Sequence, residues 1–103
     1  MSASNIQAVT KTADAHAIGG RTRVAGIYYT CTGTASSFTL RNGSVVGAPA
    51  LVTINTPAAA GAYDIILPDL GIVFSDGVFI DVNDVQVTSV TLLFYGGAAR
   101  HHD

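Results

Sequence analysis

The chain has 103 residues, the length of a single domain, and its composition excludes several classes of protein. Only 12% of the residues are charged, the formal net charge is −2, and there is one cysteine. These values exclude a basic surface for nucleic acid and a scaffold held by intrachain disulfides. No apolar run approaches the roughly 18 residues that span a bilayer, and the first residues do not resemble a signal peptide. We therefore expect a soluble protein that is made in the cytoplasm.

The charged residues that are present favour strands and turns over helices. All seven acidic residues are aspartates, and the chain has no glutamate and a single lysine, Lys11. Asp favours turns, whereas Glu and Lys favour helices, so an all-β fold is predicted. Charges also keep sheet edges from pairing with neighbours. Their shortage predicts that another chain covers part of the surface; the alternative is a surface of Thr, Ser, Asn and Gly.

In the first part of the chain, residues 1–20 have a weak strand pattern and residues 22–32 have a clear one. Residues 1–20 end on the flexible pair Gly19-Gly20 and are predicted to form an N-terminal arm. This arm is either an edge strand or a segment laid on a neighbour, with a partly disordered terminus as the alternative. Residues 22–32 are rich in β-branched and aromatic side chains and apolar on both faces, which predicts a central strand.

The middle of the chain alternates between apolar and polar residues. Residues 37–41 form one such run, and Asn42-Gly43 after them is typical of a type I′ hairpin turn. A return strand is therefore predicted to begin at 44–46. Further strands are expected at 50–55 and 62–67.

The stretch 61–82 has the most distinct turn chemistry. A corner is expected at 68–71, because Pro and Gly interrupt the apolar run there. Strands at 72–74 and 78–82 are predicted to form a hairpin across the Asp76-Gly77 turn, since this pair accepts positive φ angles.

The last and longest strand is expected over residues 85–95, with Val90, Leu92 and Phe94 on one face. About eight short strands separated by turn signals predict a single antiparallel β-sandwich of jelly-roll or Greek-key type. This domain is expected to span residues 21–96, between the arm at 1–20 and a tail at 97–103.

The sequence does not contain a set of residues that would catalyse a reaction. Cys31 lies among apolar neighbours in the middle of a predicted strand, and the three histidines lie near the two ends of the chain. A nucleophile needs an adjacent base, so Cys31 is expected to be a buried, inert thiol. We expect neither an enzyme nor a bound cofactor.

Two clusters of metal-ligand residue types were weighed against simpler interpretations. Asp81, Asn83 and Asp84 supply oxygen ligands of the kind calcium prefers, but turn chemistry explains them equally and is favoured. The tail 101–103, His-His-Asp, would hold a metal only on the axis of a symmetric oligomer, and a solvated tail is favoured. The tyrosines Tyr28, Tyr29, Tyr63 and Tyr95 are candidates for stacking on sugars, with core or interface packing as the preferred role.

Four segments carry a resemblance to a known group of proteins. They are RTRVAGIYYT at 21–30, SFTLRNG at 37–43, PAAAGAYDIILP at 57–68 and GIVFSDGVFIDV at 71–82. In this order they resemble small β-sandwich virion proteins of tailed bacteriophages, over about residues 21–95. The shared positions are packing and turn positions, so no functional residue can be carried over.

The resemblance implies a non-enzymatic capsid decoration (cement) protein that sits on the virion head as a homotrimer. Its expected partners are the major capsid protein and further copies of itself, and its expected location is the virion surface after synthesis in the host cytoplasm. The residues expected to contact a partner are Ile6, Val9, Lys11, Arg21 and Arg23. The alternative is a carbohydrate-binding or host-attachment module of a phage tail or fibre. A cupin-like enzyme is disfavoured, because no histidine lies between Ala17 and Arg100.

Overall fold

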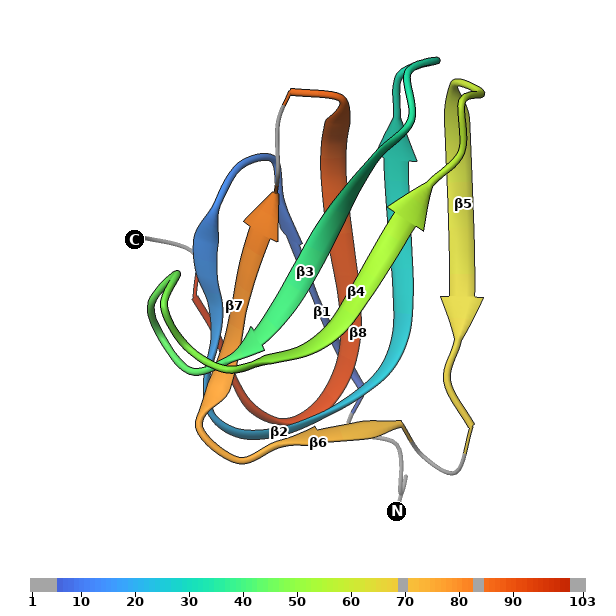
Figure 1. Ribbon diagram of the computed structural model, residues 1–103. Helices are drawn as coiled ribbons and strands as arrows, with labels where there is room; N and C mark the ends of the chain where they lie inside the picture. The colour runs from blue at the N-terminus through green and yellow to red at the C-terminus, as the bar shows by residue number, and fades with distance from the viewer. Residues whose placement is uncertain (1–5, 69–70, 83–84, 101–103) are drawn as a thin grey trace.

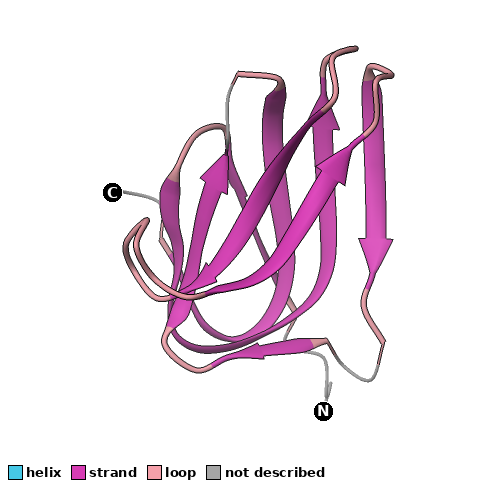
Figure 2. Cartoon of the chain, viewed as in Figure 1, coloured by secondary structure: helices cyan, strands magenta, loops and turns pink. Residues whose placement is uncertain are grey.

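A computed structural model describes residues 6–68, 71–82 and 85–100 of the chain. The described residues form eight β-strands and no helix, which confirms the all-β fold class (Figure 2). The strands are β1 (Gln7–Lys11), β2 (Ala15–Cys31), β3 (Ser36–Asn42), β4 (Ala50–Thr56), β5 (Gly61–Ile66), β6 (Ile72–Phe74), β7 (Gly77–Val82) and β8 (Val87–Ala99).

All strands belong to one antiparallel sheet that is organised around β2. The strand order is β1-β8-β2-β7-β3-β4, and β5 and β6 also pair with β2. One side of β2 pairs with β8, and its other side pairs in turn with β7, β6 and β5. In Figure 1, β2 begins beside β7, curves at the lower end and rises between β8 and β5. The prediction of a central strand over 22–32 is confirmed, although the strand starts earlier.

The curve in β2 lies at Ala25, where both of its neighbours are irregular. Val24 pairs with Ile72 and Gly26 with Ile66, so Ala25 lies at the junction between the β6 and β5 pairings. The register of β8 shifts at the same point. Gly71 has a φ of 95°, and a Cβ there would lie 2.0 Å from the Val24 carbonyl oxygen. Only glycine fits at this crossing, which explains the predicted corner; residues 69–70 lie outside the described residues.

Two predicted hairpins are corrected by the strand pairing. The turn at Ser75-Asp76 is present, but β6 and β7 pair with successive parts of β2 and are not paired with each other. No return strand begins at 44–46; residues 43–49 form a loop, and β4 starts at Ala50. The Arg41 guanidinium donates to the Ala48 carbonyl oxygen at 3.0 Å and holds this longer loop against β3.

The described residues of the expected N-terminal arm lie largely within the sheet. β1 pairs with β8 as an edge strand, which was one of the two forms considered. Residues 15–20 belong to the central strand, and Ala17 and Ile18 are fully buried. The tail expected from residue 97 is also shorter, because β8 extends to Ala99. The pair Gly19-Gly20, which is expected to end the arm, instead lies with Gly96-Gly97 at an irregularity in the β2–β8 pairing.

The core is formed by the inward faces of β1, β2, β3, β6, β7 and β8. Its largest fully buried side chains include three phenylalanines, Phe38, Phe74 and Phe94. The predicted inward face of the last strand is confirmed, since Val90, Leu92 and Phe94 are at most 1% exposed. Burial of this apolar surface is the main force that holds the sheet in its curved shape.

Candidate functional site

Cys31 and His16 are the single cysteine and the single histidine among the described residues. Cys31 is buried, as predicted, and its thiol donates to the Ala59 carbonyl oxygen at 3.6 Å. The buried Nε2 of His16 has no hydrogen-bond partner. Across residues 6–68, 71–82 and 85–100, no three His, Cys, Asp or Glu side chains lie close enough together to hold a metal ion. In that part of the chain no helix has the length and apolar character needed to cross a membrane.

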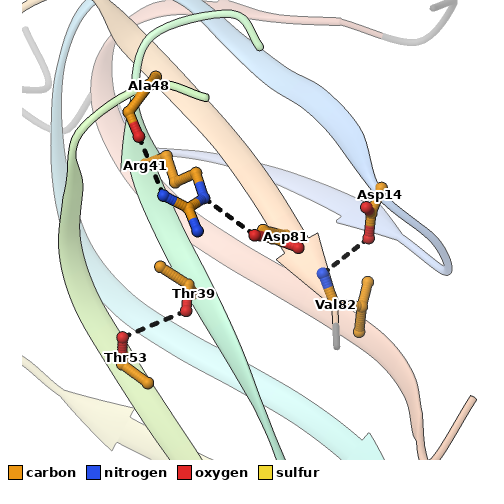
Figure 3. A network of polar contacts seen from close by, with 7 residues as sticks. All are labelled: Asp14, Thr39, Arg41, Ala48, Thr53, Asp81 and Val82. Atoms are coloured by element: carbon orange, nitrogen blue, oxygen red, sulfur yellow. Dashed lines mark hydrogen bonds and ion pairs between the residues drawn. The ribbon is translucent and has the colours of Figure 1, made fainter. Parts of the chain in front are cut away.

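The outer side of β3, β4 and β7 carries polar groups that satisfy one another (Figure 3). Arg41 in β3 pairs with Asp81 in β7 through a 2.9 Å contact between Nε and Oδ2. The hydroxyls of Thr39 and Thr53 are 3.1 Å apart. Asp81 therefore lies in a strand and has an ion-pair partner there, whereas turn chemistry was the interpretation preferred for it. Asn83, Asp84 and the tail 101–103 lie outside the described residues.

Tyr29 and Tyr63 pack in the interior and are not exposed stacking platforms. Tyr29 packs edge-on against Phe38, with ring centroids 5.3 Å apart, and stacks on Tyr63 at 5.4 Å. The Tyr63 hydroxyl donates to the Ala59 carbonyl oxygen at 2.7 Å. Burial, with smaller contributions from Cys31 and Tyr63, raises the pKa of Tyr29 above its ordinary value of 10.0. Tyr28, in contrast, points outward and is 48% exposed.

The outer side of β1, β8, β2 and β5 carries an apolar row. Strand pairing places Ala8 beside Leu93, Leu93 beside Gly26, and Gly26 beside Ile66. Ile66 is 74% exposed, and the half-exposed Tyr28 lies two residues along β2 from Gly26. Side chains two apart on a strand share a face. We call this surface, defined by Ala8, Leu93, Ile66 and Tyr28, the outer apolar face. It is a candidate contact surface for a large partner.

The β4 strand is an edge of the sheet without charged side chains. It pairs with β3 on one side only and ends the strand order. Its sequence, ALVTINT, contains no charge and no proline. Its one irregularity is a register shift at Leu51, which is 45% exposed. Edge strands of soluble proteins normally carry charges, proline or bulges that prevent pairing with another chain. An uncharged edge of seven residues is therefore a candidate for strand addition.

A cationic groove lies on the outside of the curve in β2. It has a volume of about 230 Å³ and is lined by Arg21, Thr22, Arg23, Val73, Tyr95 and Gly96. Arg23 pairs across the sheet with Tyr95 on β8 and with Val73 on β6. Among the described residues, the side chains of Arg21 and Arg23 have no hydrogen-bond or ion-pair partner. We call this feature the arginine groove.

The structure brings together some of the partner-binding residues expected from the sequence and separates others. Arg21 and Arg23 share the arginine groove. Ile6, 46% exposed, immediately precedes Gln7, whose side chain donates to the carbonyl oxygen of Gly96 at 3.4 Å in the groove lining. Lys11 lies at the other end of β1, and Val9 is buried in the core. Sequence reasoning considered Tyr95 only for stacking on sugars and missed Gly96; both reach the groove through strand pairing. It also missed the β4 edge, whose signal was its lack of charge.

No protein-family model, no curated protein and no solved structure matches the chain. The functional argument therefore depends on the surfaces described above and on the resemblance found in the sequence.

Proposed function

We propose that this chain is a non-enzymatic structural protein that acts by binding other protein chains. In the specific form of the proposal it is a capsid decoration protein of a tailed bacteriophage, which binds and stabilises the head shell as a homotrimer. Under this proposal, the curved sheet folds over its core as an antiparallel β-sandwich of jelly-roll or Greek-key type. The phage setting is supported by the sequence resemblance, and the binding role by the outer apolar face and the β4 edge.

The observation that carries the proposal is the uncharged, exposed β4 edge. A free edge offers the N–H and C=O groups of every second residue to an added strand. In a three-fold ring each contact is heterologous, so β4 of one copy would meet a different edge of the next copy. The other free edges in the described sheet are β1, β5 and the three-residue β6. The outer apolar face would remain available for the major capsid protein.

Electron microscopy of virions and one substitution test this proposal. The protein is expected on the head, in a fixed ratio to the shell protein; its presence on fibres alone would contradict decoration. Thr53→Lys places a charge in the middle of the β4 edge and should reduce trimer formation and shell binding at least tenfold. Thr12→Lys adds the same charge to the exposed loop between β1 and β2 and should have no such effect. Equal binding by both variants would exclude β4 as the interface.

A carbohydrate-binding or host-attachment module is the second candidate, and the exposed Tyr28 ring favours it. On a glycan array this alternative predicts binding that Tyr28→Ala abolishes. The decoration proposal predicts no glycan binding by either protein.

A further inference from the structure

We propose that the arginine groove binds a carboxylate side chain from an acidic segment of the partner protein. This inference rests on the proposed function, because it specifies the chemistry of a partner that binds the outside of the sheet. It names a site for an anionic group in a chain whose own net charge is −2.

The two guanidinium groups are arranged for one shared ligand. Arg21 and Arg23 are two residues apart on β2, and Thr22 between them is buried at 2% exposure. Residues two apart on a strand point to the same side, so both arginines project outward into the groove. Two adjacent cations without a carboxylate partner repel each other, and an anion held between them removes that repulsion. Arg41, in contrast, already has Asp81.

The remaining lining favours a peptide over a bare inorganic anion. Tyr95 and Val73 lie on either side of Arg23 and supply apolar walls against which the stem of an acidic residue can pack. Gly96 adds no side chain to the lining. The outer apolar face is continuous with the groove, since Leu93 and Tyr95 are two residues apart on β8. A partner segment that combines an acidic residue with apolar neighbours would therefore contact both surfaces.

The overall charge disfavours nucleic acid as the ligand. The chain has only five Lys and Arg residues, and Arg41 is already neutralised by Asp81. A nucleic-acid site requires a basic stripe that follows many phosphates. The groove, at about 230 Å³, has room for a single acidic side chain and its stem.

The test is an NMR titration of the full chain with a capped tri-aspartate peptide, with capped tri-asparagine and inorganic phosphate as the other probes. The aspartate peptide is expected to shift the Arg21, Arg23, Tyr95 and Gly96 signals. The double variant Arg21→Gln/Arg23→Gln should weaken this binding at least tenfold, since it removes two charge-assisted contacts. Arg100→Gln removes one exposed cation outside the groove and should leave the affinity within twofold of wild type.

Three outcomes would overturn the inference: equal shifts with the asparagine peptide, unchanged affinity in the double variant, or tighter binding of phosphate than of the aspartate peptide. If the double variant loses peptide binding but Thr53→Lys still assembles and binds shells, the groove is confirmed and the β4 proposal fails. If the double variant binds the peptide like wild type while Thr53→Lys fails to assemble, the groove inference fails and the β4 proposal is supported.

Discussion

Strands β2 and β4 are both rich in apolar side chains, yet they occupy opposite positions in the sheet. β2 is paired on both sides, and Ile18, Val24 and Ile27 are at most 1% exposed. β4 is paired only with β3, and Leu51 remains 45% exposed. The same apolar composition therefore builds the core in β2 and leaves an open edge in β4. The comparison teaches that apolar composition reflects burial within the chain in β2, whereas in β4 it leaves a surface that we propose a second copy covers.

The largest difference between these two strands is expected from truncation of matched aliphatic side chains. Ile27→Ala leaves a cavity in the core beside a fully paired strand and should lower the free energy of unfolding by about 2–5 kcal/mol. Leu51→Ala should change it by no more than about 0.5 kcal/mol in the monomer, because this side chain is half exposed. Urea unfolding of both variants measures the difference. Similar losses would show that β4 is part of the core of a single chain.

A smaller loss is expected at the corner that gives β2 its two sets of neighbours. Gly71→Ala combines a positive φ with a backbone clash at Val24 and should cost at least about 2 kcal/mol. Gly20→Ala is the control, since its φ is 83° but no atom lies within 4 Å of the added Cβ; about 1 kcal/mol is expected. Thermal or urea unfolding of both variants measures the difference between their losses of unfolding free energy. Equal losses would remove the argument that the close crossing at Ala25 requires glycine.

The smallest effect concerns pH and again depends on burial in β2. Because burial raises the pKa of Tyr29, the folded chain retains its phenolic proton at a pH where the unfolded chain has released it. This contribution to stability is complete below about pH 10 and is lost as the pH rises above it. Tyr29→Phe should flatten the decline in unfolding free energy above about pH 10, because phenylalanine has no phenolic proton to release. Parallel pH profiles for the two proteins would contradict this.

Local sequence pattern predicted the features that depend on neighbouring residues. The alternation of Val90, Leu92 and Phe94 gave the buried face of β8, and the β-branched run at 22–32 gave the central strand. The features it missed depend on distant pairing. The Asp76-Gly77 turn signal predicts a hairpin only if its flanking strands prefer each other, whereas both pair with β2. Glycines at 19–20 have the composition of a linker but lie in an irregular part of a strand.

The candidate site also depends on pairing between strands that are distant in the sequence. Arg21 and Arg23 were expected to contact a partner, but the groove exists only because β8 brings Tyr95 beside Arg23 from more than seventy residues away. Val9 was expected at a contact surface and is instead buried, because β1 pairs with β8 and turns this side chain inward. The register of β1 on β8 cannot be inferred from the five residues of the strand alone.

The mass of the purified chain in solution tests the central claim most directly. Multi-angle light scattering at micromolar concentration should give a mass about three times the 10.6 kDa of one chain, and Thr53→Lys should return it to the mass of one chain. A wild-type protein that remains monomeric at this concentration would contradict the claim that a second copy covers the β4 edge.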